Sequence, residues 1–345
     1  MKKLFTKTTK YSFAVFMAAL LWASCKKDDA GVANPLIVSG PDSVKAGGVV
    51  ILEGKDLAEI RSIIVELGNT PVSFNPVLNN RNAVIFRVPD TAWGGPTNLI
   101  LTNSKGKEIK YPLVVITPPI IESISSTDYI GGMEIIIKGN NLQFVTEVAL
   151  INMAGEPTGE TAEIISKDKK KIVIKMPASV SPKVKLKITN TSSTNITKQA
   201  FVNIDLTRPV FLDNYATRME NWSWGQTASA ISTTEKFFGN ASLKLDFTGQ
   251  PPGGGFRIWN RDFIAFEDYQ EVAFWIKGAD KPLKFIFSLD QKEWQNVDVP
   301  ADVWSYHSFP ISIWRNAGMS QTNSIVLRWV SAGTIVYIDN LVLIK

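Results

Sequence analysis

The sequence predicts an all-β protein with several sandwich domains in tandem. Short runs of alternating apolar and polar residues, the pattern of half-buried strands, are separated by turns rich in Gly, Pro and Asn. A repeat of about 85 residues recurs in the first part of the chain and shows no helical periodicity of useful length. With 345 residues, 45% of them hydrophobic, 23 Gly and 18 Pro, the chain has the composition of two or three folded domains.

The first 24 residues have the pattern of a secretory signal, which is excluded from the fold. Four lysines precede an apolar run, 11–22, that is shorter than the roughly 20 residues a membrane-spanning helix needs. Small residues then lead into Cys25, the only cysteine of the chain, which cannot form an internal disulfide. Alternatively, Cys25 is an incidental buried thiol.

The segment Leu21-Trp22-Ala23-Ser24-Cys25 resembles a bacterial lipobox, with Trp22 where Leu is usual. The resemblance implies that Cys25 becomes the acylated N-terminus and carries the several acyl chains that stable anchoring requires. The charged residues at 26–29, within a linker over 25–33, resemble the export signal of Bacteroidetes lipoproteins, although they could equally be a solvated linker. We therefore expect a protein anchored in the outer membrane by lipid and facing the cell exterior.

The repeat aligns residues 46–57 with 131–142 and contains a Gly-x-(Asn/Asp)-Leu sequence in each copy, at Gly54–Leu57 and Gly139–Leu142. Each copy predicts a small β-sandwich. The signature resembles that of immunoglobulin-like TIG/IPT domains, which implies one such domain over 34–117 and another over 118–205. Thr117-Pro118-Pro119 predicts a stiff joint between them. We interpret both as spacers, with Trp93 folded onto its own sandwich and 167–171 as a solvated hairpin.

From residue 206 to 345 the strands become longer and more aromatic. Alternation predicts strands over 242–247, 272–277, 282–289, 308–313, 324–330 and 335–344, which suits a two-sheet jelly roll. The segments 238–245, 273–278 and 337–341 resemble those of carbohydrate-binding-module jelly rolls. With the lipobox and the TIG-like repeats, the chain resembles Bacteroidetes surface glycan-binding proteins. That resemblance implies a SusC/SusD-like transporter as partner and a C-terminal domain for xyloglucan or another β-glucan.

Eight of the ten tryptophans lie in this last domain, between Trp222 and Trp329. A pyranose ring exposes C–H groups on its faces and hydroxyls at its edge. An aromatic plane therefore fits the face, with a contribution of about 1 kcal/mol per good contact, while Arg, Asp, Asn and Gln fit the edge. A line of tryptophans along a groove would select an extended β-linked chain.

Alternation and local composition sort these tryptophans into platform and core. Trp222 and Trp224 point to one side of a polar segment, and Trp259 shares a face with Arg257, opposite to the apolar Phe256 and Ile258. The predicted carbohydrate-binding residues are Trp222, Trp224, Trp259, Arg257 and Trp294, with Asn260, Gln226, Asp290 and Arg328 as edge partners. We expect Trp275 to pack between the sheets, and Trp304, Trp314 and Trp329 to be structural.

Charge and residue type argue against other functions. The formal charge is +5, but six lysines lie at or before Lys27, so the mature domains lack the basic footprint of a nucleic-acid-binding protein. His307, the only histidine, has no Asp or Cys beside it in the sequence and is expected to be an exposed strand residue. The paired carboxylates 267–268 and Asp290 with Glu293 stand in ordinary turns, so we predict no catalytic residues, no cofactor and no metal beyond a structural calcium that Asp213 and Asp339 could share.

The sequence thus predicts a non-catalytic, lipid-anchored polysaccharide-binding protein that takes an extended β-glucan or hemicellulose such as xyloglucan or mixed-linkage glucan. Two alternatives remain open at this point. A protein-interaction or adhesion module has precedent in the TIG-like domains, and a glycoside-active enzyme could use the same C-terminal domain.

Overall fold

The computed structural model describes residues 34–225, 228–331 and 333–345, and it confirms the all-β class. The predicted signal, Cys25, the linker and Gln226 lie outside the described residues. The chain divides into two compact units, one ending at Pro118 and including Thr191–Ser193, the other formed by the remaining residues to Lys345. Among the described residues, none of the helices has the length and apolar character that crossing a membrane requires.

The first sandwich packs a three-stranded sheet, β1-β3-β6, against a five-stranded one, β2-β8-β7-β4-β5. Its elements are β1 (Leu36–Ser39), β2 (Ser43–Lys45), β3 (Val49–Lys55), β4 (Ile60–Val65), β5 (Thr70–Pro71), the 3-10 turn η1 (Pro76–Leu78), β6 (Ala83–Arg87), β7 (Gly95–Asn103) and β8 (Glu108–Ile116). Alternate residues of β3 and β7, among them Val50, Leu52 and Leu99, are fully buried between the sheets. Strand β2 runs parallel to β8.

The second sandwich repeats this plan with sheets β14-β15-β11-β9 and β10-β18-β16-β12-β13. Its elements are β9 (Ile120–Ile124), β10 (Asp128–Tyr129), β11 (Glu134–Asn140), β12 (Val145–Ile151), β13 (Pro157–Thr161), β14 (Glu163–Lys167), β15 (Lys171–Lys175), β16 (Lys183–Asn190), β17 (Thr194–Ile196), β18 (Phe201–Asn203) and the 3-10 turn η2 (Ile204–Leu206). Strand β10 runs parallel to β18, as β2 does to β8. The predicted hairpin at 167–171 is confirmed between β14 and β15.

The repeated Gly-x-(Asn/Asp)-Leu sequence has the same physical basis in both sandwiches. A Cβ on Gly54 would lie 1.9 Å from the carbonyl oxygen of Leu36, and one on Gly139 would lie 1.7 Å from that of Ile120. Glycine therefore lets the first strand of each domain pair closely with β3 or β11. Asp56 and Asn141 adopt positive φ values of 57° and 60°, which Asp and Asn tolerate better than most residues. The leucine that follows each is fully buried.

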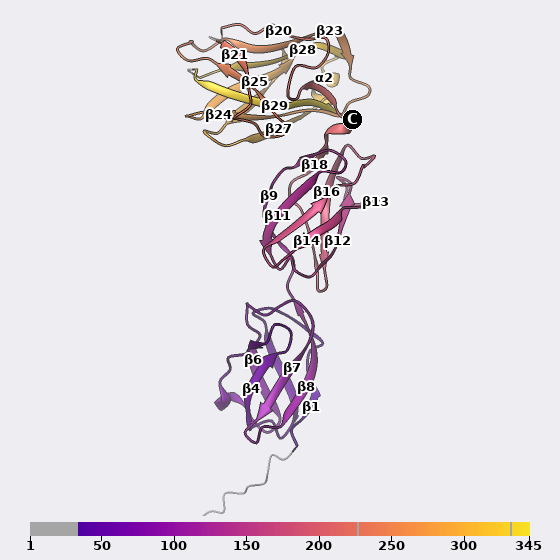
Figure 1. Cartoon of the computed structure of the whole chain (residues 1–345), viewed down its shortest axis with the longest axis vertical. Coiled ribbons are helices and arrows are strands. Elements are labelled where there is room, and N and C mark those ends of the chain that lie inside the picture. The colour runs from indigo at the N-terminus through magenta and orange to yellow at the C-terminus, as the bar shows by residue number, and fades with distance from the viewer. Residues whose placement is uncertain (1–33, 226–227, 332) are drawn as a thin grey trace, which may run out of the picture. The chain divides into compact units, whose positions relative to one another are not determined.

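The third sandwich is a jelly roll of two larger sheets (Figure 1). The first, called here the β24 sheet, has the order β21-β22-β29-β24-β27, with β19 paired to β29; the second, the β23 sheet, has the order β20-β23-β28-β25-β26. Their elements are β19 (Arg208–Phe211), β20 (Met219–Asn221), β21 (Ala228–Ser232), β22 (Ser242–Asp246), β23 (Gly255–Ala265), β24 (Glu271–Gly278), β25 (Leu283–Leu289), β26 (Lys292–Val299), β27 (Ser305–Pro310), α2 (Ser312–Asn316), β28 (Gln321–Trp329) and β29 (Ile335–Ile344).

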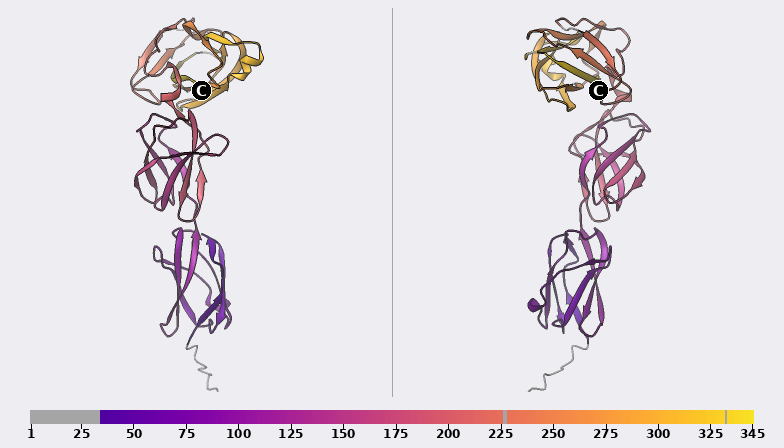
Figure 2. Two further views of the ribbon diagram at one scale, coloured as in Figure 1. Left: turned by 90° about the vertical axis from the view of Figure 1, so that its right-hand side faces the viewer. Right: turned by 60° about the vertical axis from the view of Figure 1, so that its left-hand side comes forward.

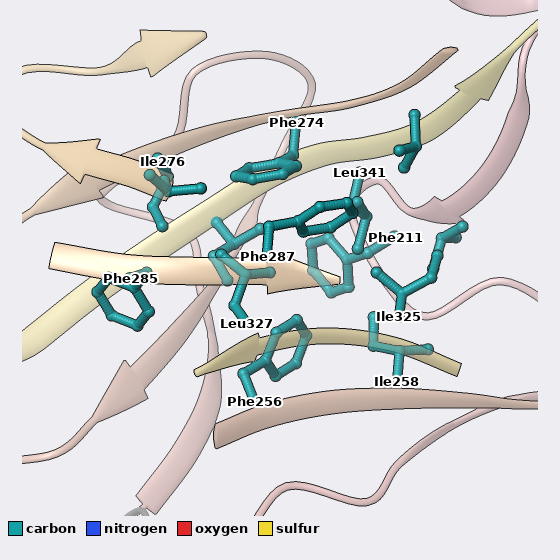
Figure 3. Packing of buried hydrophobic residues seen from close by; sticks show 14 of the residues in the cluster. Phe211, Phe256, Ile258, Phe274, Ile276, Phe285, Phe287, Ile325, Leu327 and Leu341 are labelled. Carbon is teal, nitrogen blue, oxygen red and sulfur yellow. The ribbon is translucent and has the colours of Figure 1, made fainter. Parts of the chain in front are cut away.

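The core of the jelly roll lies between these two sheets, which the views of Figure 2 show as the two layers of the sandwich. Phe274 and Ile276 of the β24 sheet point toward Phe285, Phe287 and other apolar side chains of the β23 sheet (Figure 3). Trp329 is buried in the same cluster, as predicted, and stacks obliquely on Phe247. Most of the aromatic content of this domain is therefore core.

The structure corrects the predictions for one strand and one tryptophan of this domain. The strand expected over 308–313 ends at Pro310, and 312–316 form the short helix α2, which directs Trp314 into the core, where its indole nitrogen donates to the carbonyl of Lys292 at 2.8 Å. Trp275 does not pack between the sheets. It lies on the outer face of the β24 sheet, stacked on Phe237 with ring centroids 3.6 Å apart. Phe237, from the loop between β21 and β22, and Asp128 of the second sandwich contact it there.

Candidate functional site

The outer face of the β23 sheet collects most of the predicted binding residues. Strand register places Trp222, Arg257, Val326, Ser288 and Trp294 on one line across five strands, because Trp222 pairs with Arg257, and Val326 pairs with both Arg257 and Ser288. Trp294 follows on the last strand by alternation from the buried Val297. At ~4.8 Å between neighbouring strands, the line is about 19 Å long. We call this surface the aromatic face.

Trp222 and Trp259 lie together at the end of the aromatic face formed by β20 and β23. Their ring centroids lie 4.9 Å apart with an interplanar angle of 35°, and Trp222 is 52% exposed. The Trp222 indole N–H donates to Glu220 at 3.0 Å, and Arg261 pairs with the other oxygen of the same carboxylate. These donors, Trp222 first, lower the pKa of Glu220, so the carboxylate stays ionised and fixes the indole plane.

Trp224 extends this edge along the strand direction. It pairs with Gly255, and a Cβ on that glycine would lie 2.5 Å from the Trp224 ring, so the indole rests directly on the glycine backbone. Its N–H donates to the carbonyl of Gly253 at 3.3 Å, and Arg328 donates to the same carbonyl at 3.2 Å. The ring is partly exposed and has an exposed guanidinium nearby.

The middle of the aromatic face has a floor of small residues. Ser288, Ser324 and Val326 are almost fully buried although they point away from the core, so the larger side chains around them close over this floor. Arg257 is one of these side chains: its Nε donates to Ser324 Oγ at 2.8 Å, which holds the guanidinium on the face. Arginine fixed in this way presents further N–H donors in a rigid plane.

Asp290 lies in the turn between β25 and β26, beside Ser324, which pairs with Trp259. Its backbone N–H donates to the carbonyl of Ser324 at 2.8 Å, and its φ of 48° is one of several positive values in this turn. Burial raises the pKa of Asp290, an effect that Thr322 and the charge of Arg257 oppose. Asp290 and Arg257 therefore place an acidic and a basic group near Trp222 and Trp259.

One predicted residue does not reach this surface. Asn260 is only 2% exposed, because it follows Phe256 and Ile258 in the alternation of β23 and so faces inward with them. Its assignment as an edge partner is wrong. Gln226 lies outside the described residues, so its place is not assigned.

Three residues on or near the face were not selected from the sequence. Glu220 and Arg261 hold Trp222, and Phe263 is 58% exposed on the irregular part of β23 that follows Trp259. Alternation with Trp222 could have indicated Glu220. Nothing in the local sequence marks the irregularity at which four residues, 260–263, oppose Asn323 alone.

The residues considered for metal and acid–base chemistry have other structural roles. Asp213 accepts the backbone N–H groups of Asn240 and Ala241, and Asp339 accepts those of Phe237 and Phe238. No group of three or more His, Cys, Asp or Glu residues suited to a metal occurs among 34–225, 228–331 and 333–345. His307 was expected to be exposed, but it is half-buried. Its ring stacks on Phe274 and shares a hydrogen bond with the Ser305 hydroxyl.

The arrangement would suit a ligand with flat apolar faces and polar edges. Three indoles supply apolar planes at one edge, Trp294 supplies another on the last strand, and two guanidiniums and a carboxylate stand between or beside them. A separate hollow of about 420 Å³ opens where β25 begins and β26 ends, lined by residues that include Lys284, Asp298 and Ser331. The aromatic face takes its side chains from all five strands of the β23 sheet or the residues that directly follow them.

Comparisons with known proteins agree with this architecture. A family model described as IPT/TIG domain matches residues 119–202. The surface glycan-binding protein PbSGBP-B from Prevotella bryantii superposes with a TM-score of 0.52 at 14% identity, over 91% of this chain and 99% of that one. SGBP-B from a complex xyloglucan utilization locus in Bacteroides uniformis gives a TM-score of 0.42 at 15% identity, over 90% and 99%. No curated protein sequence matches. The chain thus shares its fold with a surface glycan-binding protein.

Proposed function

We propose that the protein is a non-catalytic cell-surface lipoprotein that captures an extended β-linked glycan on the aromatic face and presents it to a SusC/SusD-like importer. The ligand we favour is a β-glucan such as xyloglucan or mixed-linkage glucan. The lipid anchor at Cys25 would hold the protein in the outer membrane, facing outward. The proposal takes its biological setting from the lipobox-like leader and from the fold shared with PbSGBP-B.

The observation that carries the proposal is the line of side chains across the outer face of the β23 sheet. Tryptophans stand at both ends of this line, and the fixed guanidinium of Arg257 stands between them. An extended β-linked glucan has flat ring faces and a continuous edge of hydroxyls, so several of its sugars can meet the face at once. Because the line crosses the whole sheet, it can meet several consecutive sugars within a long chain and does not require a chain end.

The direct test is affinity electrophoresis of the mature protein, with Cys25 replaced by Ser, through gels containing xyloglucan, mixed-linkage glucan or host polysaccharides. A Trp222→Ala/Trp224→Ala/Trp259→Ala variant should lose binding by about 100-fold, since each aromatic contact contributes about 1 kcal/mol. Trp93→Ala is the matched control, because Trp93 is a partly exposed tryptophan of the first domain and is not part of the aromatic face.

The outcomes separate the candidate functions. Retardation that the triple variant abolishes and the control keeps would support glycan capture on this face. Release of reducing sugars would instead identify a glycoside-active enzyme. Failure of every glycan to retard the protein would contradict the proposal and favour a protein-interaction or adhesion module.

A further inference from the structure

Asp128 of the second sandwich is buried in a polar site that the jelly roll completes. It is 2% exposed, and its Oδ2 accepts the indole N–H of Trp275 at 3.1 Å and the amide of Asn340 at 2.6 Å. Its Oδ1 is equally buried but has no hydrogen-bond partner. One carboxylate oxygen thus takes both donors, and the other is buried without a partner.

The contact around Asp128 is built on both sides. Val202 and Ile204 of the second sandwich pack in one buried cluster with Ala273, Val342 and Ile344 of the jelly roll. Phe237 stacks on the Trp275 ring, which fixes the indole that donates to Asp128. In the first sandwich, the repeat places the exposed Ser43 where the second has Asp128. The carboxyl group is therefore a particular feature of the second repeat.

The titratable groups facing this contact include more acids than bases. Glu271, Asp339 and the phenol of Tyr306 come from the jelly roll, and Lys183 of the second sandwich pairs with Glu271 at 2.6 Å. Burial raises the pKa of Asp128 to about 6. Burial, with a smaller contribution from the charge of Asp128, likewise raises the pKa of Asp339 to about 6. The Tyr306 hydroxyl is also buried without a partner.

We propose that a proton on Oδ1 of Asp128 controls how firmly the second sandwich docks on the jelly roll. The neutral acid keeps both donor bonds to Oδ2 and removes the unpaired buried charge. Because the docked state holds this proton more tightly than an undocked one, docking is strongest below pH 4, weakens as pH rises through about 6, and is weakest above it. A rise of about two pKa units corresponds to a change of roughly 100-fold in the docking equilibrium. The aromatic face would move more freely on its tether at higher pH.

The test measures the distance between spin labels on the two domains of the full mature chain. Cys25 is the only cysteine, so with Cys25→Ser the pair Lys170→Cys and Asn316→Cys labels one exposed site on each domain. We expect a narrow distance distribution at pH 5 that broadens by pH 8, with a midpoint near pH 6. Asp128→Asn imitates the protonated acid, because its carbonyl can accept both donors, and it should keep the distribution narrow throughout.

Two further variants make the outcome decisive. Asp128→Ala removes the acceptor and should broaden the distance distribution at every pH. Far-ultraviolet circular dichroism checks that this variant and the next remain folded. Asp339→Asn removes the second carboxyl that titrates near pH 6. A pH response that remains in this variant then belongs to Asp128. A wild-type distribution that does not change between pH 5 and 8, or a change that persists in Asp128→Asn, would overturn the proposal. None of these readouts depends on glycan binding.

Discussion

Glu220 is a single residue whose effect on the aromatic face is indirect. It accepts the Trp222 N–H and pairs with Arg261, so it orients the indole plane through these two contacts. Glu220→Ala should lower glycan affinity about threefold by freeing the Trp222 ring, whereas Glu220→Gln keeps an acceptor and should lose less. Isothermal titration against the retained glycan checks this. Equal losses in both variants would mean that the negative charge itself contacts the ligand.

Gly255 determines whether Trp224 can lie flat. Its replacement by Ala would place a methyl group 2.5 Å from the indole, so the ring must lift from the face. Gly255→Ala should therefore weaken binding about as much as Trp224→Ala, roughly fivefold by the usual value of one aromatic contact. The double variant should lose no more than either single one. Additive losses would show that Gly255 acts through something other than Trp224.

His307 introduces a second pH dependence, opposite in sign to that of Asp128. Burial lowers the pKa of His307, so the folded state favours the neutral ring. Its contribution to stability is complete above the ordinary pKa of 6.5 and is lost as pH falls below it. His307→Gln should therefore unfold at a urea concentration that falls less between pH 7.5 and 5 than in the wild type. An unchanged pH slope would place the effect elsewhere.

At the level of single residues, alternation predicted which side chains of β23 face outward and also shows where prediction stops. Phe256 and Ile258 face inward and Arg257 and Trp259 outward, as expected from the period of two. The same rule, extended by one residue, would have placed Asn260 inside. The partner of Trp275 could not be found in this way, because Asp128 lies 147 residues away in another domain.

At the level of elements, the paired glycines of the two repeats allow a matched prediction. Gly54→Ala and Gly139→Ala would each drive a methyl group into a backbone carbonyl of the paired first strand, β1 or β9, which cannot yield as a side chain can. Each should destabilise its own domain by about 2 kcal/mol or more, in the range of other steric overpacking. Gly106→Ala, with open space around it, should cost about 1 kcal/mol for its positive φ alone. Urea unfolding of the three variants checks the order, and similar losses in all three would contradict it.

Strands were easier to predict than the segments between them. The repeat indicated β3 and β11 together with the turns that follow, because Gly, Asp or Asn, and Leu each meet a local requirement there. Helix α2 carries no such signal: its five residues, Ser312–Asn316, are too few for a helical period, and tertiary packing of Trp314 holds it in place. The irregular part of β23 was also missed, because no local sequence pattern marks it.

At the scale of the whole molecule, the two compact units predict an asymmetric response to truncation. The second sandwich and the jelly roll belong to one unit and share a buried apolar cluster, whereas the first sandwich belongs to the other unit. Removing residues 34–117 should leave both glycan affinity and the melting temperature of the jelly roll unchanged. Calorimetry and titration of that shortened protein check this.

Removing the second sandwich as well should have a different effect, because the jelly roll would then expose Val342 and Ile344 to water and leave Trp275 and Asn340 without their carboxylate. Losing those donor bonds to a charged group and that buried surface should lower its melting temperature by about 5 °C or more. Asp128→Ala in the longer protein should reproduce part of this loss. If the isolated jelly roll melted at the same temperature as the intact chain, the shared cluster would be a passive contact, and the second sandwich would be a spacer equivalent to the first.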